Sequence, residues 1–217
     1  MILAGAPCRS DMHKLLTAML CGILMAGFGV TIVRADDHGS ANAGSAACTN
    51  AQSGGDGSGN DQGDRVARSS ENDQGTEGDD DVRGSSGNDQ VHGQKGNDQL
   101  SGASGDDDLC GDEGDDHLNG GQGDDDLDGG PGNDVLSGGA GNDTERGAAG
   151  ADKIVGGSGN DVLNGGSGAD RIAGNAGNDR IDARDGRKDT INCGSGSDTV
   201  TADASDVVSR NCEHVSR

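Results

Sequence analysis

An aspartate recurs at every ninth residue through the middle of the chain. A glycine stands two residues before each of these aspartates, and an aliphatic residue stands two residues after it in all units but one. A strict period of nine predicts a repeat architecture, in which each unit is one structural step that packs only on its neighbours. The repeating aspartates are Asp80, Asp89, Asp98, Asp107, Asp116, Asp125, Asp134, Asp143, Asp152, Asp161, Asp170 and Asp179.

The aliphatic position of the repeat predicts a narrow core. It is occupied by Val, Leu or Ile from Val82 to Ile181, except at Glu145. A disordered polyelectrolyte would have no reason to hold aliphatic residues at one phase of the repeat, so the pattern argues against disorder despite the polar composition. An unpaired charge at Glu145 would be costly inside a core. We therefore expect a weak point between about residues 78–138 and 147–184.

The composition excludes an ordinary hydrophobic fold and several classes of partner. The 217 residues include 43 Gly and neither Trp nor Tyr, and the formal net charge is -23. Such a polyanion is repelled by nucleic acid and by anionic membrane surfaces, and it attracts cations. We therefore expect no nucleic-acid partner, and no membrane partner for the mature chain.

The stretch GGPGNDVLSGGAGND, from Gly129 to Asp143, shows the full repeat. It resembles GGxGxDxUx, the nonapeptide of the RTX, or haemolysin-type, calcium-binding repeat family. The resemblance implies that nine residues form half a turn of a right-handed parallel β-roll, with GGxGxD as the loop and xUx as the strand. The expected fold is all-β, a β-solenoid of about six 18-residue coils over residues 78–184, with a C-terminal cap at 185–217.

The residue types in the loop suit a calcium site. Glycine allows positive φ and lets carbonyl groups approach an ion, and Asn before the aspartate, as at Asn133, suits left-handed turn geometry. Carboxylate and carbonyl oxygens match the six to eight ligands that Ca²⁺ accepts, whereas Mg²⁺ fits such loops poorly. The twelve aspartates are the predicted ligands. Asp125 and Asp143 would lie on one side of the roll and Asp134 and Asp152 on the other, with roughly ten ions between coils.

Beyond Asp179 the repeat is less regular. Asp189 and Asp198 keep the spacing to an aliphatic residue, but Arg187 and Cys193 stand where the family has glycine. Asp198 and Asp189 are therefore weaker candidates for ligands. Before the regular repeats, residues 36–77 read as a flexible linker followed by degenerate repeats.

Other sites and activities fit the sequence less well. An EF-hand loop beginning at Asp124 would need Glu at the position that Val135 occupies, and a zinc site lacks a CxxC pair. The histidines stand in unrelated contexts and no nucleophile motif is visible, so we expect no enzyme. An ice-binding solenoid would present a rank of Thr on its surface, but the residues after the aspartates are mixed.

The first 35 residues read as a secretory signal peptide. The apolar stretch Leu15–Val33 follows basic residues, and small residues precede a cleavage position at Asp36. An uncleaved anchor is the alternative, because 19 residues can just span a bilayer.

Four cysteines remain after this segment, which suits an oxidising compartment. Their spacing does not fix the connectivity. A Cys193–Cys212 bridge would close a short loop, worth roughly 3 kcal/mol in the chain-entropy model, and would leave Cys48 with Cys110.

The sequence thus predicts a secreted calcium-binding protein, without catalytic activity, whose repeats fold on binding Ca²⁺. The alternative is an extracellular structural or adhesive scaffold, or an accessory module of a secreted system. Whether the rod contacts a cell surface or a polysaccharide stays open.

Overall fold

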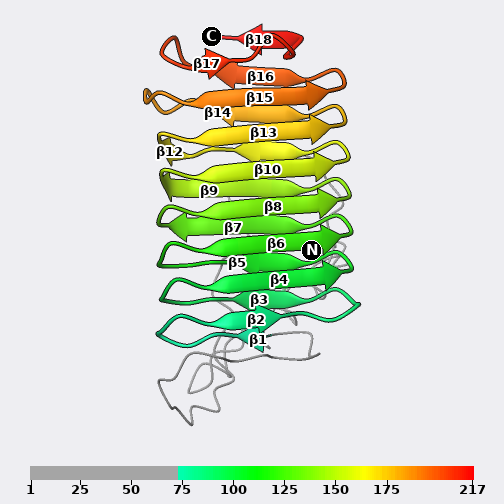
Figure 1. Cartoon of the computed structure of the whole chain (residues 1–217), viewed down its shortest axis with the longest axis vertical. Coiled ribbons are helices and arrows are strands. Elements are labelled where there is room, and N and C mark those ends of the chain that lie inside the picture. Colours follow the sequence, from blue (N-terminus) through cyan, green and yellow to red (C-terminus); the bar gives the residue numbers. More distant parts are fainter. Residues whose placement is uncertain (1–72) are drawn as a thin grey trace, which may run out of the picture. The chain divides into compact units, whose positions relative to one another are not determined.

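A computed structural model describes residues 73–217, which form two stacked parallel sheets (Figure 1). One sheet contains β1 (Asp73–Gln74), β3 (Gln90–His92), β5 (Asp108–Cys110), β7 (Asp126–Pro131), β9 (Thr144–Gly150), β11 (Val162–Asn164), β12 (Ser167–Gly168), β14 (Arg180–Ala183), β16 (Thr199–Ala202) and β18 (His214–Ser216). The other contains β2 (Asp81–Arg83), β4 (Gln99–Ser104), β6 (His117–Gln122), β8 (Val135–Ala140), β10 (Lys153–Ser158), β13 (Arg171–Ala176), β15 (Thr190–Ser195) and β17 (Val207–Val208). No helix within these residues is long and apolar enough to span a membrane.

Successive strands alternate between the two sheets, so two nonapeptides make one coil. Leu100 pairs in register with Leu118, and Leu118 with Leu136, each 18 residues further along the chain. The predicted right-handed parallel β-roll is confirmed. It has about eight turns rather than six, because β15 to β18 continue both sheets beyond residue 184.

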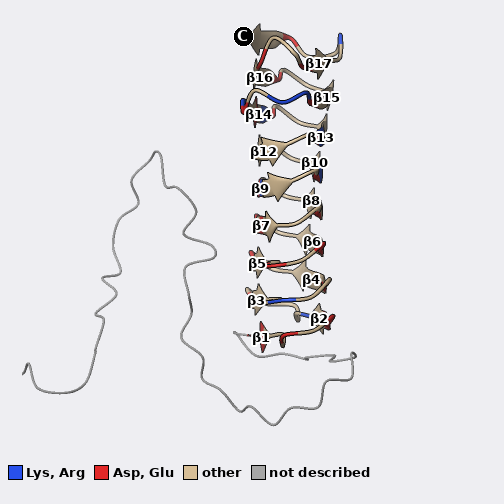
Figure 2. Cartoon of the chain, turned by 90° about the vertical axis from the view of Figure 1, so that its left-hand side faces the viewer, with Lys and Arg blue, Asp and Glu red and all other residues tan. Residues whose placement is uncertain are grey.

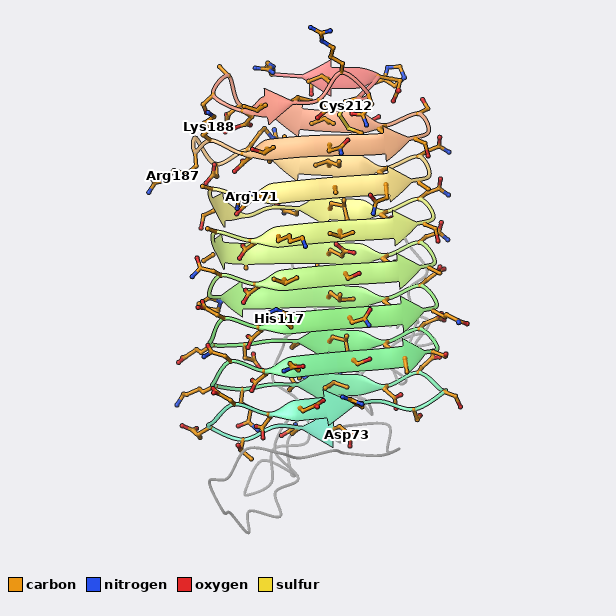
Figure 3. All side chains as sticks on the ribbon, viewed as in Figure 1. Asp73, His117, Arg171, Arg187, Lys188 and Cys212 are labelled. Carbon is orange, nitrogen blue, oxygen red and sulfur yellow. A yellow bond between two sulfur atoms is a disulfide. The ribbon has the colours of Figure 1, made fainter. Side chains whose placement is uncertain are left out.

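The aliphatic column fills the space between the sheets, as predicted. Its members from Val82 to Ile181 are buried, whereas the residues directly after the repeating aspartates are half-buried or, like His117 and Arg171, exposed on the outer faces (Figure 3). The apolar side chains form two separate clusters, one ending at Leu136 and the other starting at Ile154. Glu145 lies between them and is 0% exposed. The predicted inward position of Glu145 is therefore confirmed, and the weak point expected there stays a prediction.

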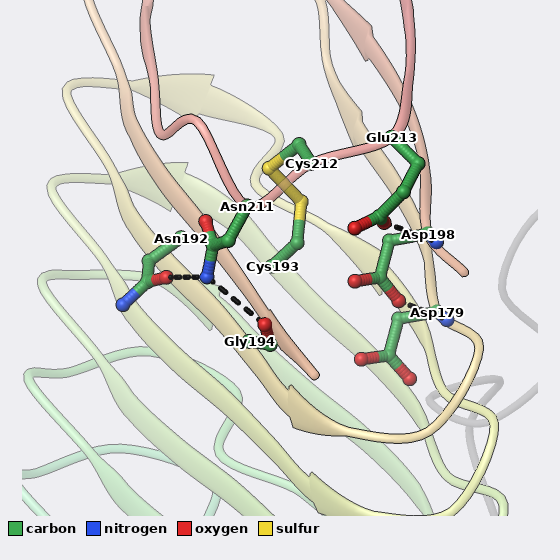
Figure 4. The surroundings of a disulfide bond; sticks show 8 residues. All are labelled: Asp179, Asn192, Cys193, Gly194, Asp198, Asn211, Cys212 and Glu213. Carbon is green, nitrogen blue, oxygen red and sulfur yellow. Dashed lines mark hydrogen bonds between the residues drawn. A yellow bond between two sulfur atoms is a disulfide. The ribbon is translucent and has the colours of Figure 1, made fainter. Parts of the chain in front are cut away.

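A disulfide joins Cys193 in β15 to Cys212, with a Cα–Cα distance of 5.2 Å (Figure 4). The Asn211 side chain beside it donates hydrogen bonds to Asn192 Oδ1 at 2.7 Å and to the Gly194 carbonyl at 3.1 Å. The predicted Cys193–Cys212 pairing is confirmed. Cys110 is also disulfide-bonded, but Cys48 lies outside the described residues, as do the predicted signal peptide (1–35) and most of the predicted linker (36–77).

Left-handed backbone recurs at two loop positions, four and two residues before the repeating aspartate. Gly121 (φ 115°) and Gly123 (φ 128°), which precede Asp125, are one such pair. The expectation that Asn before the aspartate is left-handed is wrong, because positions such as Asn133 do not have positive φ. Instead, these side chains link coils: the Asn133 main-chain N–H donates to Asp115 Oδ1 at 2.7 Å, and Asn133 Oδ1 accepts from the Ala151 N–H at 3.0 Å.

Ala148 occupies the left-handed position four residues before Asp152 (φ 70°), where five of the twelve repeats have glycine. This backbone conformation costs an L-residue with a Cβ roughly 1 kcal/mol. We therefore expect Ala148→Gly to raise the free energy of unfolding by about 0.5–1 kcal/mol, measured by urea denaturation in saturating Ca²⁺. Ala149→Gly is the matched control: Ala149 is exposed without positive φ, so glycine there should only destabilise. Equal losses in both variants would contradict the strain at Ala148.

Candidate metal centre

Each repeating aspartate lies directly before a strand, and the 18-residue register stacks these side chains into two columns. In Figure 2, Asp and Glu recur at the turns of successive coils. The first column, along the sheet of β2 to β17, contains Asp80, Asp98, Asp116, Asp134, Asp152, Asp170, Asp189 and Asp206. The second column, along the sheet of β3 to β18, contains Asp89, Asp107, Asp125, Asp143, Asp161, Asp179, Asp198 and Glu213. The expected division of the aspartates between two sides of the roll is confirmed.

One carboxylate oxygen of each column member holds adjacent coils together. Asp134 Oδ1 accepts a hydrogen bond from the Asp116 N–H at 2.8 Å, and the Asp134 N–H donates to Asp152 Oδ1 at 2.8 Å. The same bond recurs along both columns at 2.7–3.0 Å. Glu213 Oε2 takes this role at the end of the second column, where it accepts from the Asp198 N–H (Figure 4).

The Oδ2 atoms of Asp80, Asp89 and Asp206 accept hydrogen bonds from the main-chain N–H groups of Thr76, Ser85 and Asp203. In the other aspartates of the columns, the second carboxylate oxygen has no hydrogen-bond partner within the described residues. This holds for the Oδ2 atoms of Asp98, Asp107, Asp116, Asp125, Asp134, Asp143, Asp152, Asp161, Asp170, Asp179, Asp189 and Asp198, all of which are buried. An unsatisfied buried carboxylate oxygen is costly, so a regular row of them indicates a missing partner of positive charge.

Glycine makes room for these oxygens. A Cβ on Gly147 would meet Asp152 Oδ2 and would lie 2.5 Å from the Gly165 carbonyl oxygen of the next coil. A Cβ on Gly111 would lie 2.5 Å from both Asp116 Oδ2 and the Gly129 carbonyl oxygen. The glycine five residues before the aspartate is thus required for close approach, and the space it leaves is bordered by one carboxylate and one carbonyl oxygen.

Burial makes the charged form of the column aspartates unfavourable. Desolvation, offset only in part by the hydrogen bond from the preceding coil, raises the pKa of Asp134 and of Asp152 to about 7. The same cause raises the pKa of Asp98, Asp116, Asp125, Asp161 and Asp170 to about 6. Neighbouring aspartates of the same column raise the pKa of Asp134 further. Each column therefore needs protons or cations to lower its internal repulsion.

The donor atoms fit a hard cation. Within residues 73–217 no group of three or more His, Cys, Asp or Glu side chains converges on one point, so an ion in these loops would depend on main-chain carbonyls as well as on aspartate. Oxygen-only donor sets on irregular loops suit Ca²⁺, whereas Zn²⁺ prefers nitrogen and sulfur and Mg²⁺ requires a near-ideal octahedron.

A family model for the RTX calcium-binding nonapeptide repeat matches the chain four times, at residues 74–109, 111–145, 146–181 and 164–200. These matches cover more than half of the chain. The chain belongs to this family. No curated protein matches it significantly. RTX repeats bind Ca²⁺ in general, and the family match begins and ends within the two stacked sheets described above.

The sequence did not predict Asp206 and Glu213, the last members of the first and second columns. Asp206 Oδ1 accepts from the Asp189 N–H at 3.0 Å, although the two residues are 17 apart, and Glu213 stands 15 residues after Asp198. In the sequence, the only indication of these two positions is the short apolar segment that follows, such as Val207–Val208 after Asp206. Asp73, in contrast, pairs with Val91 and so lies in register with the aliphatic column.

Gly84 and Gly87 offer a matched test of the space beside the aspartates. Gly84→Ala places a Cβ against Asp89 Oδ2 and a carbonyl oxygen, whereas a Cβ on Gly87 meets nothing within 4 Å. We expect Gly84→Ala to lower the calcium-dependent thermal midpoint by several degrees, as a loss of about 1–2 kcal/mol would produce. Gly87→Ala should leave the midpoint within about one degree. Equal effects of the two substitutions would mean that the space beside Asp89 is not needed.

Proposed function

We propose that this chain is a secreted calcium-binding protein whose β-roll folds when Ca²⁺ binds at the two aspartate columns. The observation that supports this most is the row of buried, unpartnered Oδ2 atoms, which from Asp98 to Asp179 each lie beside a glycine that leaves room for an ion. Bound Ca²⁺ would supply the positive charge that both columns need. The predicted ligands are Asp80, Asp89, Asp98, Asp107, Asp116, Asp125, Asp134, Asp143, Asp152, Asp161, Asp170 and Asp179, with Asp189 and Asp198 added by their place in the columns.

Folding and ion binding would be coupled because the core is thin. Each nonapeptide contributes one aliphatic side chain of roughly 2 kcal/mol, which is far below the entropy cost of ordering nine residues. Stacking the coils also brings like charges together along each column. The aspartates therefore oppose folding until cations neutralise them, and they hold successive coils together afterwards.

Several features support an extracellular setting. The Cys193–Cys212 disulfide is typical of an oxidising compartment. Extracellular calcium modules bind at about 10⁻⁴ to 10⁻³ M, so the same loops would stay unfolded at the far lower calcium levels inside a cell. We assign no catalytic role, because the chemistry of the described loops is that of ion binding and inter-coil hydrogen bonding.

A calcium titration tests this function. The protein, purified in chelator, should show little strand signal by circular dichroism and should gain it cooperatively at millimolar Ca²⁺, while equal Mg²⁺ has little effect. Calorimetry should count roughly ten ions. A chelated protein with the same spectrum and melting curve as the loaded one would contradict coupled folding. The absence of any calorimetric signal for Ca²⁺ would contradict the function itself.

Asp134 tests the contribution of one column position. Asp134→Ala removes a predicted ligand and the acceptor for the Asp116 N–H, so it should lower the number of bound ions by one or two and raise the calcium concentration needed for folding. Asp126→Ala is the control, because Asp126 carries the same charge on the outer face. Within the described residues, its ion pair is with Arg146, at 3.0 Å. This pair is part-buried, and its loss removes no oxygen from either aspartate column. An unchanged ion count in Asp134→Ala would exclude Asp134 as a ligand.

A further inference from the structure

Glu145 is the one charged residue in the aliphatic column. It lies in β9 between Leu127 and Leu163, with which it is in register, and it is 0% exposed. Neither carboxylate oxygen has a hydrogen-bond partner of good geometry within the described residues. The family repeat has an aliphatic residue at this position, so the repeat itself gives no role to Glu145.

The Glu145 side chain turns toward the loop rather than into the centre of the core. Its Oε1 borders the space beside Gly138, 2.5 Å from where a Cβ would lie, and Asp143 Oδ2 borders the same space. In the loop of Asp170, the corresponding space beside Gly165 is bordered by Asp170 Oδ2 and by the Cδ1 methyl group of Ile172. At Gly138, a second carboxylate oxygen therefore replaces a methyl group beside the predicted ion position.

Within residues 73–217, no cationic side chain forms an ion pair with Glu145. The charged groups that act on its buried carboxylate are those of Asp161, Asp143 and Asp179, all of them acidic, and the Gly138 main-chain N–H lies close to it. The adjacent Arg146 lies on the outer face, where it donates to Asp126 at 3.0 Å. Because a buried carboxylate needs a counter-charge or a partner, this position requires something that the described side chains do not supply.

We propose that Glu145 is an additional ligand for the divalent cation bound at the Asp143 loop. The inference rests on the proposed function, since it assumes that the second column holds cations. It assigns to this loop an anionic oxygen at a place where the Asp170 loop has a methyl group. Higher ligand charge increases affinity for Ca²⁺, so the Asp143 loop becomes the tightest site of the second column, and the bound ion connects the two apolar clusters that Glu145 separates.

Replacing Glu145 by glutamine and by leucine distinguishes a cation ligand from a buried charge that only destabilises the core. Glu145→Gln keeps the volume and removes the charge, and Glu145→Leu restores the family residue. In a calorimetric Ca²⁺ titration, both variants should weaken the tightest class of ions by roughly tenfold or more, the effect typical of lost ligand support. In a titration followed by circular dichroism, both variants should also need more Ca²⁺ to fold. Glu113→Gln is the control, because it makes the same change at an exposed loop position and should match the unmodified chain.

The opposite results would overturn the inference. If Glu145 were only a buried misfit, Glu145→Leu would fold at lower Ca²⁺, melt at a higher temperature and keep the tightest class of ions. Failure of the proposed function looks different, since the unmodified protein would then bind no Ca²⁺. Normal binding by the unmodified chain with identical isotherms for the Glu145 variants would reject only the role of Glu145.

Carboxyl-carbon NMR gives an independent readout. The chain has five glutamates, so ¹³C-carboxyl labelling of Glu yields few signals, and the one missing in Glu145→Gln identifies Glu145. In calcium-loaded protein at pH 7, a coordinating Glu145 should resonate as an ionised carboxylate. A resonance typical of a protonated acid would contradict ligation.

Discussion

The interaction on which the structure depends is the bond from each column carboxylate to the main-chain N–H of the preceding coil. Asp134 Oδ1 and its equivalents supply an acceptor to an amide at the start of each strand, where the sheet ladder begins. The same bond fixes the second oxygen, Oδ2, in a buried position without a partner. Ordering the coils and leaving a row of unpartnered carboxylate oxygens are thus two consequences of one side-chain geometry.

This geometry accounts for the spacing of glycine in the repeat. The glycine five residues before the aspartate lets Oδ2 and a carbonyl oxygen of the next coil share the space where a Cβ would lie, as at Gly84. The positions four and two residues before the aspartate are left-handed, as at Gly121 and Gly123. A Cβ on Gly121 or Gly123 would also meet a carbonyl oxygen of the preceding coil, so these glycines allow close approach as well as positive φ. A repeat rich in glycine follows from both requirements.

Periodicity predicted the features that every coil shares. The nine-residue spacing gave the strands, the inward column and the two rows of aspartate, because each is set by contacts between identical neighbours. It did not give what breaks the period. Asp170 and Asp189 are 19 residues apart yet still bond, because the extra residue is accommodated in the loop where Asp185 Oδ2 accepts the Gly168 N–H. The role of Asn133 was also missed, since a ladder between loops of successive coils has no signature within a single loop.

The interruption at Glu145 shows which interactions carry continuity along the roll. The apolar core is divided there into two clusters, yet β9 pairs in register with β7 on one side and β11 on the other. The second column also continues, because the Asp125 N–H donates to Asp143 Oδ1 and the Asp143 N–H donates to Asp161 Oδ1. The main-chain pairing of the strands and the aspartate columns therefore continue through a position where apolar packing is interrupted. A rod held together in this way tolerates a charge in its core where, as at Glu145, the carboxylate lies beside a loop glycine.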